Sequence, residues 1–284
     1  MLQIGLRAHD FGKTTPELLA GSLAAFKPAS IQLAFGKALS NPPPVPGGIT
    51  PGYAHYIRSV FEKHQIRIAI LGCYINPVHP DREIRDRMLS SFEEHLRFAR
   101  DFNCSLVGTE TGSCNPDCSW HPDTSKPQTF DLFCQSIERL LNTAEKCGSM
   151  VGVEAVADQH TVSSIEIMEK LVEKLKSPAL KVIYDPVNLI PEKGLTEPQE
   201  TFFARAFSAF GPHIAAIHSK DFRMGGNKKT GTLPAGTGEM DYASFLKLLI
   251  KQKPGIDILL ENSSPAAAGA SMRFLEETAA QVPL

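Results

Sequence analysis

Eight short apolar segments recur along the chain, and a longer stretch with helical periodicity follows each of them. The apolar segments cover residues 2–6, 30–35, 66–71, 104–110, 150–156, 180–185, 213–219 and 256–262. The helical stretches cover residues 15–26, 53–64, 82–101, 129–147, 164–175, 197–210, 242–251 and 266–279. This alternation is typical of parallel strands joined by crossover helices.

Eight strand–helix units in 284 residues predict an α/β protein with a closed (β/α)₈ TIM barrel. Barrel strands are covered on both faces, which explains why the apolar segments are nearly continuous. A doubly wound open sheet is the alternative, but no Gly-x-Gly-x-x-Gly follows the first segment. No shift in composition marks a boundary. We therefore expect residues 1–284 to form a single barrel domain, with the Pro/Gly-rich residues 40–48 as a surface loop.

Charge and hydropathy restrict the partners. The net charge is −2, so no global field recruits nucleic acid or an anionic membrane. No apolar run approaches the ~20 residues that span a bilayer, and the first residues lack the features of a signal peptide. We expect a cytoplasmic protein that binds a small molecule, and neither nucleic acid nor membranes. A homo-oligomer is left open.

The six cysteines are too few for a disulfide framework in a chain of this length, and reduced thiols are expected. Cys114, Cys118 and His121 lie close together in the sequence and raise the alternative of a zinc site. A fourth ligand is missing there, so a polar loop explains the stretch equally well.

Metal-type ligands stand at the ends of four consecutive apolar segments: Glu154, Asp185, His218 and Glu261. Strand carboxyl ends meet at one face of a barrel and carry its chemistry. Each residue alone has a structural explanation, such as a helix cap or a salt bridge. Three carboxylates gathered at one barrel mouth, however, repel one another unless a cation neutralises them. The sequence predicts one divalent metal here, with Mn²⁺ or Mg²⁺ favoured and Co²⁺ or Zn²⁺ as alternatives.

The motifs GVEAV, YDPVN, HSKDFR and LLEN, in this order, resemble the xylose isomerase-like TIM barrels, a superfamily of sugar phosphate isomerases and epimerases. Its relatives include ketohexose 3-epimerases, inosose dehydratases, hydroxypyruvate isomerases and endonuclease IV enzymes. The resemblance implies that the four residues hold the metal and that Glu154 and Glu261 form the acid/base pair. It also implies that Arg223, the nearest match to an arginine after the histidine, contacts substrate oxygens.

One position departs from the superfamily pattern. The motif after the sixth strand usually continues Asp-x-x-His, whereas this chain has Asn188, which can bind a hydroxyl but cannot titrate. The endonuclease branch also needs histidines after the third and fourth strands, where this chain reads ILGCYINP and VGTETG. A three-zinc nuclease or phosphoesterase is therefore disfavoured.

Further polar residues are expected near the mouth. His9 and Glu110 follow the first and fourth strands and are predicted to bind substrate, with a rim hydrogen bond and a salt bridge as their alternative roles. Asp221 follows His218 and is predicted to orient it or to bind substrate. Residues 220–242 are predicted to form a mobile polar loop, whose lysines we interpret as solvated in preference to a phosphate site.

These residues together predict a divalent-metal-dependent isomerase or epimerase of a ketose, a sugar phosphate or a related polyol. One glutamate would remove a proton beside the carbonyl to give an enediolate, and the other would return one. A keto-polyol dehydratase with the same metal site is the first alternative. A non-catalytic sugar-binding barrel is another, because this architecture hosts many functions.

Overall fold

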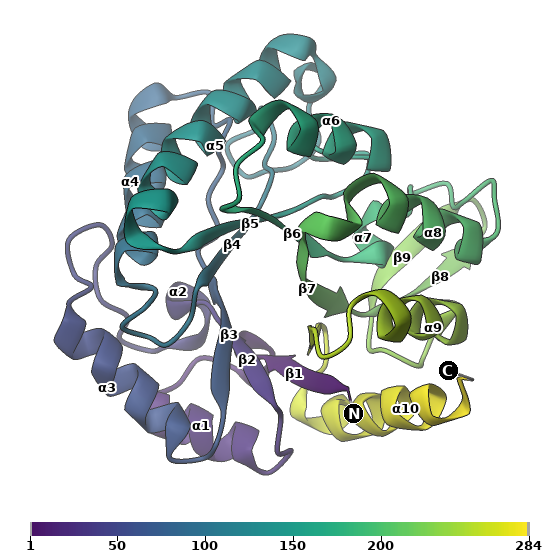
Figure 1. The fold of residues 1–284 in the computed structure, drawn as a ribbon, viewed down its shortest axis with the longest axis horizontal. Helices are drawn as coiled ribbons and strands as arrows, with labels where there is room; N and C mark the ends of the chain where they lie inside the picture. The colour runs from purple at the N-terminus through teal and green to yellow at the C-terminus, as the bar shows by residue number, and fades with distance from the viewer. Residues whose placement is uncertain (1, 283–284) are drawn as a thin grey trace.

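The computed structural model describes residues 2–282 and shows a closed barrel of eight parallel strands surrounded by helices (Figure 1). The strands are β1 (Gln3–Arg7), β2 (Ser30–Leu33), β3 (Arg67–Gly72), β4 (Leu106–Glu110), β5 (Met150–Glu154), β6 (Leu180–Tyr184), β7 (Ile214–Ser219) and β10 (Asp257–Leu260). The first and last of them pair, with Leu6 opposite Leu260, and this pairing closes the barrel. The predicted (β/α)₈ class is confirmed, and the open sheet is ruled out.

Eight long helices follow the strands: α1 (Pro16–Ala24), α3 (Pro51–Glu62), α4 (Arg82–Phe98), α5 (Pro127–Cys147), α6 (Ile165–Leu175), α8 (Gln199–Phe210), α9 (Tyr242–Gln252) and α10 (Pro265–Gln281). Side-chain caps set several of their starts. Thr50, Asp81, Ser164 and Asp241 each accept a hydrogen bond from a backbone N–H of the first turn. Within residues 2–282 no helix combines the length and the apolar character that a membrane crossing requires.

Two one-turn helices, α2 (Phe35–Ala38) and α7 (Pro186–Leu189), were not predicted. Both come almost directly after a barrel strand, β2 and β6, so they lie at the carboxyl end of the barrel. They are too short to show helical periodicity in the sequence, which explains why the pattern did not reveal them.

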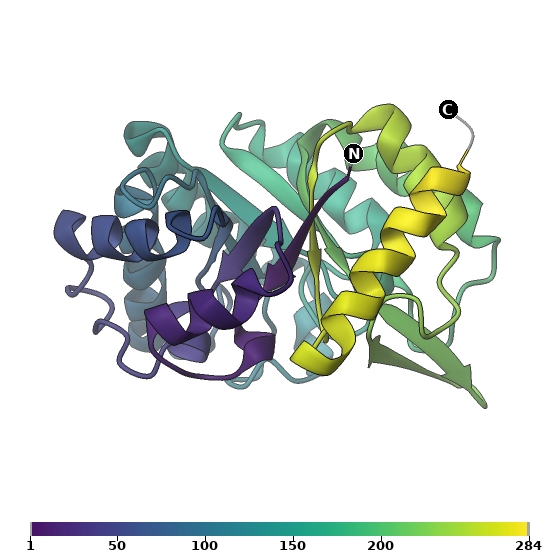
Figure 2. The same cartoon turned by 90° about the horizontal axis from the view of Figure 1, so that it is seen from below.

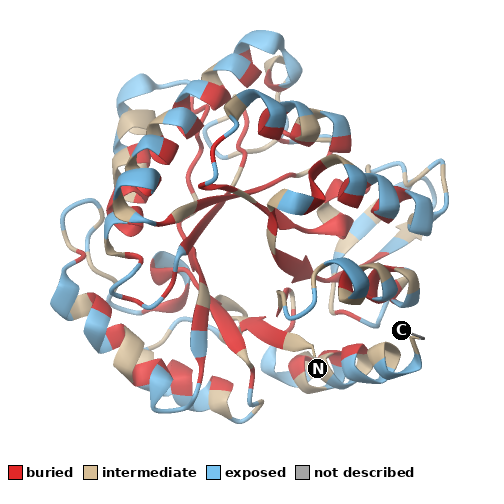
Figure 3. Ribbon diagram, in the orientation of Figure 1, coloured by how far each residue is buried: buried red, intermediate tan, exposed pale blue. Residues whose placement is uncertain are grey.

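The core has two parts. A small cluster fills the barrel interior and comprises Ile70, Leu106, Ile183, Ala216 and Leu259. A much larger cluster lies between the strands and the inner faces of the helices, as the buried stripes in Figure 3 show. Gly108 leaves room for the interior cluster, because a Cβ at this position would lie 2.5 Å from Cδ1 of Ile183. The interior is therefore packed with side chains, and polar groups are left to the strand ends.

The stretch 220–242 contains two strands, so the prediction of a loop throughout was wrong. It contains an antiparallel hairpin of β8 (Asp221–Gly225) and β9 (Lys228–Leu233), which projects from the end of the barrel opposite the N terminus (Figure 2). Its glycines and exposed polar residues hid the alternation of a strand pair. Lys228 forms an ion pair with Glu192, and Lys229 donates to carbonyl oxygens after β6, so these lysines tie the hairpin down.

Asp221 anchors the segment between the hairpin and α9. Its buried carboxylate accepts hydrogen bonds from four backbone N–H groups, at distances of 2.9 to 3.0 Å, from Phe222, Gly236, Gly238 and Met240. The chain passes so close at Gly238 that a Cβ there would lie 2.2 Å from the carbonyl oxygen of Phe222. One carboxylate therefore fixes the return of the chain from the hairpin to α9.

We predict that Asp221→Asn lowers the free energy of unfolding by about 1–3 kcal/mol, because an amide replaces a buried carboxylate that satisfies four donors. Urea denaturation measures the loss, and limited proteolysis should show faster cleavage within residues 221–240. Asp117→Asn is the matched control, since Asp117 is exposed and accepts a single backbone bond, from Ser119. Equal losses in the two variants would contradict the anchoring role.

Candidate metal centre

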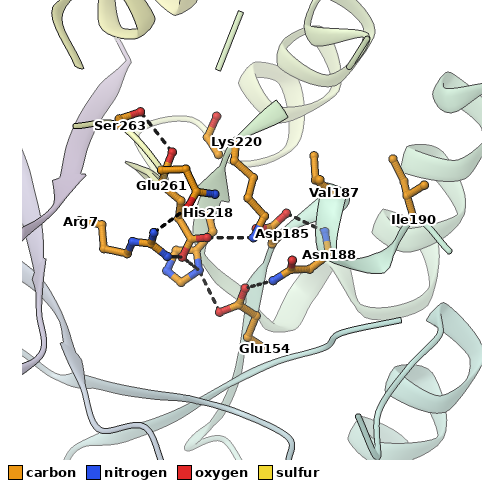
Figure 4. A network of polar contacts seen from close by, with 12 residues as sticks. Arg7, Glu154, Asp185, Val187, Asn188, Ile190, His218, Lys220, Glu261 and Ser263 are labelled. Carbon is orange, nitrogen blue, oxygen red and sulfur yellow. Dashed lines mark hydrogen bonds and ion pairs between the residues drawn. The ribbon is translucent and has the colours of Figure 1, made fainter. Parts of the chain in front are cut away.

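Four buried side chains converge at the carboxyl end of neighbouring strands: Glu154, Asp185, His218 and Glu261 (Figure 4). They come from β5, β6, β7 and β10, which are consecutive around the barrel. One potential ligand atom from each lies within 4.8 Å of all the others. The structure therefore brings together the four residues that the sequence placed at the strand ends.

Asp185 occupies this position because β6 stops there and α7 begins. Its Oδ1 accepts a hydrogen bond of 2.9 Å from the backbone N–H of Asn188, and Pro186 fills the first helical position. The carboxylate is thus held by a helix cap through one oxygen. The other oxygen, Oδ2, remains for the cluster.

Cations of the chain surround the carboxylates. Nδ1 of His218 lies 2.9 Å from Oε2 of Glu154 and 3.2 Å from Oε1 of Glu261. The Lys220 ammonium lies 2.9 Å from Oδ2 of Asp185 and 2.9 Å from Oε2 of Glu261. These contacts partly neutralise a charge cluster that would be costly in a buried site.

The carboxylates differ in their tendency to ionise. Burial raises the pKa of Asp185, and the nearby Lys220 offsets this only in part. Burial acts in the same direction on Glu261, but Lys220, His218 and Arg7 outweigh it and hold the pKa of Glu261 well below its usual range. Arg7 contributes through an ion pair of 2.9 Å to Oε1 of Glu261. Glu261 is thus the more firmly ionised of the two.

The donor atoms fit a divalent cation. Both ring nitrogens of His218 and Oδ2 of Asp185 are buried without an aligned hydrogen bond to any described residue. Nδ1 and Oδ2 do lie within ion-pair distance of charged groups, but the alignment of a hydrogen bond is missing. Buried polar atoms are ordinarily paired. Carboxylate oxygens with one imidazole nitrogen form a donor set that suits Mn²⁺, Mg²⁺ or Zn²⁺.

Asn188 and His9 lie at this end of the barrel. Asn188 donates from Nδ2 to Oε1 of Glu154 at 2.7 Å, so it holds one of the four residues directly. His9 packs edge-on against Tyr74, and its Nδ1 is buried without a partner among the described residues. Burial lowers the pKa of His9 to about 3, so this imidazole is neutral at pH 7.

Glu110 ends β4, and its Oε2 lies 3.8 Å from Nε2 of His160. Burial raises the pKa of Glu110 above the ordinary value. Its register partner on β5 is Glu154, so Glu110 stands beside the cluster, one strand away.

Asp221 and Arg223 do not join the cluster. The Asp221 carboxylate is used by the four backbone N–H groups described above and makes no contact with His218. Arg223 is exposed and donates to the carbonyl oxygen of Thr237. Cys114, Cys118 and His121 also do not form a second ligand group, because the four strand-end residues are the one such group within residues 2–282.

Lys220 was interpreted from the sequence as one of the solvated lysines of residues 220–242, and this was wrong. It is buried, with 6% of its surface exposed, and contacts two of the four residues. A signal was present in the sequence, because Lys220 stands two positions after His218 and residues i and i+2 of an extended chain point to the same side. Arg7 ends β1, and the sequence analysis predicted no role for it.

The description of a matching family model is xylose isomerase-like TIM barrel, and the match covers residues 29–278. The chain has no significant sequence match among curated proteins. Solved structures agree in fold over nearly the whole length of both chains. D-psicose 3-epimerase with D-tagatose, from Clostridium cellulolyticum H10, is 12% identical, with coverage of 98% and 99% and a TM-score of 0.71.

Two further structures add to this comparison. A 3-keto-D-glucoside 4-epimerase from E. coli is 12% identical, covers 98% of this chain and 100% of its own, and has a TM-score of 0.72. A xylose isomerase-like TIM barrel protein from Mycobacterium smegmatis in complex with magnesium is 14% identical, with coverage of 99% and 98% and a TM-score of 0.74. At these identities the likeness concerns the fold.

The buried His160 gives a prediction on pH. Burial lowers its pKa to about 4, from an ordinary value of 6.5, so the folded protein holds the ring neutral. The unfolded chain takes up this proton first as the pH falls from 6.5 to 4. The neutral ring therefore stabilises the folded protein most above pH 6.5. Between pH 6.5 and pH 4 the free energy of unfolding of the wild type should fall by up to about 3 kcal/mol relative to that of His160→Gln.

Urea denaturation of both proteins between pH 7.5 and pH 4 measures this difference. The control is His55→Gln, because His55 is exposed. Parallel pH dependence in the wild type and His160→Gln would show that His160 does not contribute to acid sensitivity.

Proposed function

The chain belongs to the xylose isomerase-like TIM barrel family, and from this premise we propose that it is a divalent-metal-dependent isomerase or epimerase. Its substrate would be a ketose, a sugar phosphate or a related polyol. The observation that carries the proposal is the convergence of four ligand atoms from four strand ends within 4.8 Å. Similar folds in a D-psicose 3-epimerase, in a 3-keto-D-glucoside 4-epimerase and in a protein complexed with magnesium support it.

Glu154, Asp185, His218 and Glu261 would hold the metal, and Mn²⁺ or Mg²⁺ matches a set of three carboxylates and one imidazole. The bound cation would stabilise the negative charge that develops on a carbonyl oxygen when the neighbouring carbon loses a proton. The protein's own residues must then supply the proton transfers.

Glu154 and Glu261 are the residues that would move the proton. They lie on either side of His218, whose Nδ1 is 2.9 Å from one and 3.2 Å from the other. Asn188 fixes an oxygen of Glu154, and Arg7 fixes an oxygen of Glu261. Two carboxylates held in defined orientations suit two proton transfers. One removes a proton to give an enediolate, and the other delivers a proton to the opposite face or to the adjacent carbon.

Substrate hydroxyls would be met by polar groups around the cluster. His9 is neutral at pH 7 and has a free, buried ring nitrogen among the described residues. Glu110 and Asn188 flank Glu154 from β4 and from α7. Hydrogen-bonding groups of this kind select a substrate by its hydroxyls, because an unmatched buried donor or acceptor is costly.

Metal content tests the first part of the proposal. Wild type dialysed against Mn²⁺ should retain about one metal per chain by mass spectrometry, whereas Asp185→Ala should lose it, because Asp185 offers the cluster an oxygen that no other group replaces. Asp117→Ala, at an exposed position, is the control. An empty wild type, or undiminished binding by Asp185→Ala, would show that the four residues are not a metal site.

Turnover tests the second part. In D₂O the metal-loaded enzyme should incorporate deuterium into a ketose at the carbon that exchanges its proton. Glu154→Gln and Glu261→Gln should each lower the rate by about 10²–10⁴-fold, while the exposed Glu62→Gln should not. A product lighter by one water would instead identify a dehydratase, and exchange that survives both glutamine variants would contradict the assigned roles.

A further inference from the structure

Lys220 is an unusual component of the candidate metal centre. It is buried, and lysine is among the residues that are seldom fully buried without a partner. Its ammonium lies 2.9 Å from Oδ2 of Asp185 and 2.9 Å from Oε2 of Glu261. Figure 4 shows the three side chains together. A positive charge of the chain therefore stands against two of the residues that would hold a metal.

The contacts of Asp185 show why this matters. Its Oδ1 is engaged with the backbone N–H of Asn188 in the cap of α7. Oδ2 is the oxygen left for a metal, and it is the oxygen that Lys220 approaches. A metal ligated by Asp185 would therefore meet the ammonium at the same atom.

The contacts of Glu261 are similar. Its Oε2 accepts a well-aligned hydrogen bond from Lys220, and its Oε1 faces Arg7 and His218. Both oxygens are thus in contact with cationic or imidazole groups of the chain. A divalent cation at this carboxylate would lie close to the Lys220 ammonium, and in a buried site the repulsion between them is strong.

We propose that the Lys220 ammonium is the resident counter-cation of the metal-free site and competes with the divalent metal for Asp185 and Glu261. The inference rests on the proposed function in that it takes the four strand-end residues as the metal site. In the metal-free protein Lys220 compensates the buried carboxylates, so the barrel mouth stays folded. A metal must displace the ammonium before it can bind Oδ2 of Asp185, and this competition weakens metal binding.

The two contacts of Lys220 indicate how the ammonium can move when a metal binds. Its bond to Glu261 has the alignment of a hydrogen bond, whereas Oδ2 of Asp185 is approached without such alignment. The two contacts have the same length, 2.9 Å, and differ in alignment. A shift of the flexible lysine side chain can release Asp185 while the bond to Glu261 is kept.

A lysine with a purely structural role makes the opposite prediction. It would hold Asp185 and Glu261 in position for the metal, and its loss would weaken metal binding or leave it unchanged. Competition and structural support therefore differ in the sign of the effect on affinity.

The experiment is calorimetric titration of Mn²⁺ into metal-stripped wild type, Lys220→Met and Lys37→Met. Methionine keeps an unbranched apolar side chain and removes the charge. Lys220→Met should bind Mn²⁺ at least about tenfold more tightly than wild type. Lys37→Met is the control for loss of a nearby charge, since Lys37 lies over the ring of Tyr74 at 3.5 Å and makes no ion pair within residues 2–282. Its affinity should stay within about threefold of wild type.

Thermal unfolding supplies a second readout. Metal-free Lys220→Met should unfold at a lower temperature than metal-free wild type, and Mn²⁺ should stabilise the variant more than it stabilises wild type. If the variant does not fold without metal, it is purified with Mn²⁺, and chelator competition should then show tighter retention than in wild type.

The outcomes separate this inference from the proposed function. Equal or weaker Mn²⁺ binding by Lys220→Met, beside a wild type that binds, overturns the competition and leaves the metal centre standing. Absence of binding in both proteins overturns the metal centre as well. A wild type that binds Mn²⁺, beside a variant that binds it at least about tenfold more tightly, supports both.

Discussion

Three carboxylates buried in one barrel mouth are the constraint on which the rest of the structure depends. Their mutual repulsion must be compensated inside the protein, and the compensating groups come from both ends of the chain. Lys220 follows β7, whereas Arg7 ends β1 and reaches Glu261 after β10. The pairing of β1 with β10 that closes the barrel is therefore also what delivers the arginine to the cluster. The same strand pairing therefore closes the sheet and helps to neutralise the buried carboxylates.

The segment after β7 links this cluster to the hairpin. His218 and Lys220 point into the site, and Asp221, the next residue, gathers four backbone N–H groups from the hairpin and its return. The hairpin in turn holds the segment after β6, where Lys229 donates to the carbonyl oxygen of Val187. The ends of β6 and β7, which supply two of the four ligands, are thus braced by the same structure.

The sequence was sufficient for the barrel and for the four strand-end residues, because both follow from periodicity that is repeated eight times and from the position of a residue within its strand. It was insufficient for groups placed by irregular backbone. Arg223 was expected at the substrate, and in the structure it is exposed on β8, next to a register irregularity between Asp221 and Arg223. Asp221 was expected to orient His218, yet nearby N–H groups of a turn use its carboxylate. The position of the Lys220 ammonium could not be predicted, because strand periodicity gives the direction of a long side chain but not the point that it reaches.

Asn188 bears on the number of metals that the proposed centre would hold. It stands where the superfamily pattern has a histidine, and its amide donates to Oε1 of Glu154. It therefore fixes a glutamate without adding an imidazole that could bind a further cation. Around the same cluster, Lys220 and Arg7 contact carboxylate oxygens of Asp185 and Glu261. Under the proposed function this donor set would hold one divalent cation, which suits proton transfer beside a carbonyl.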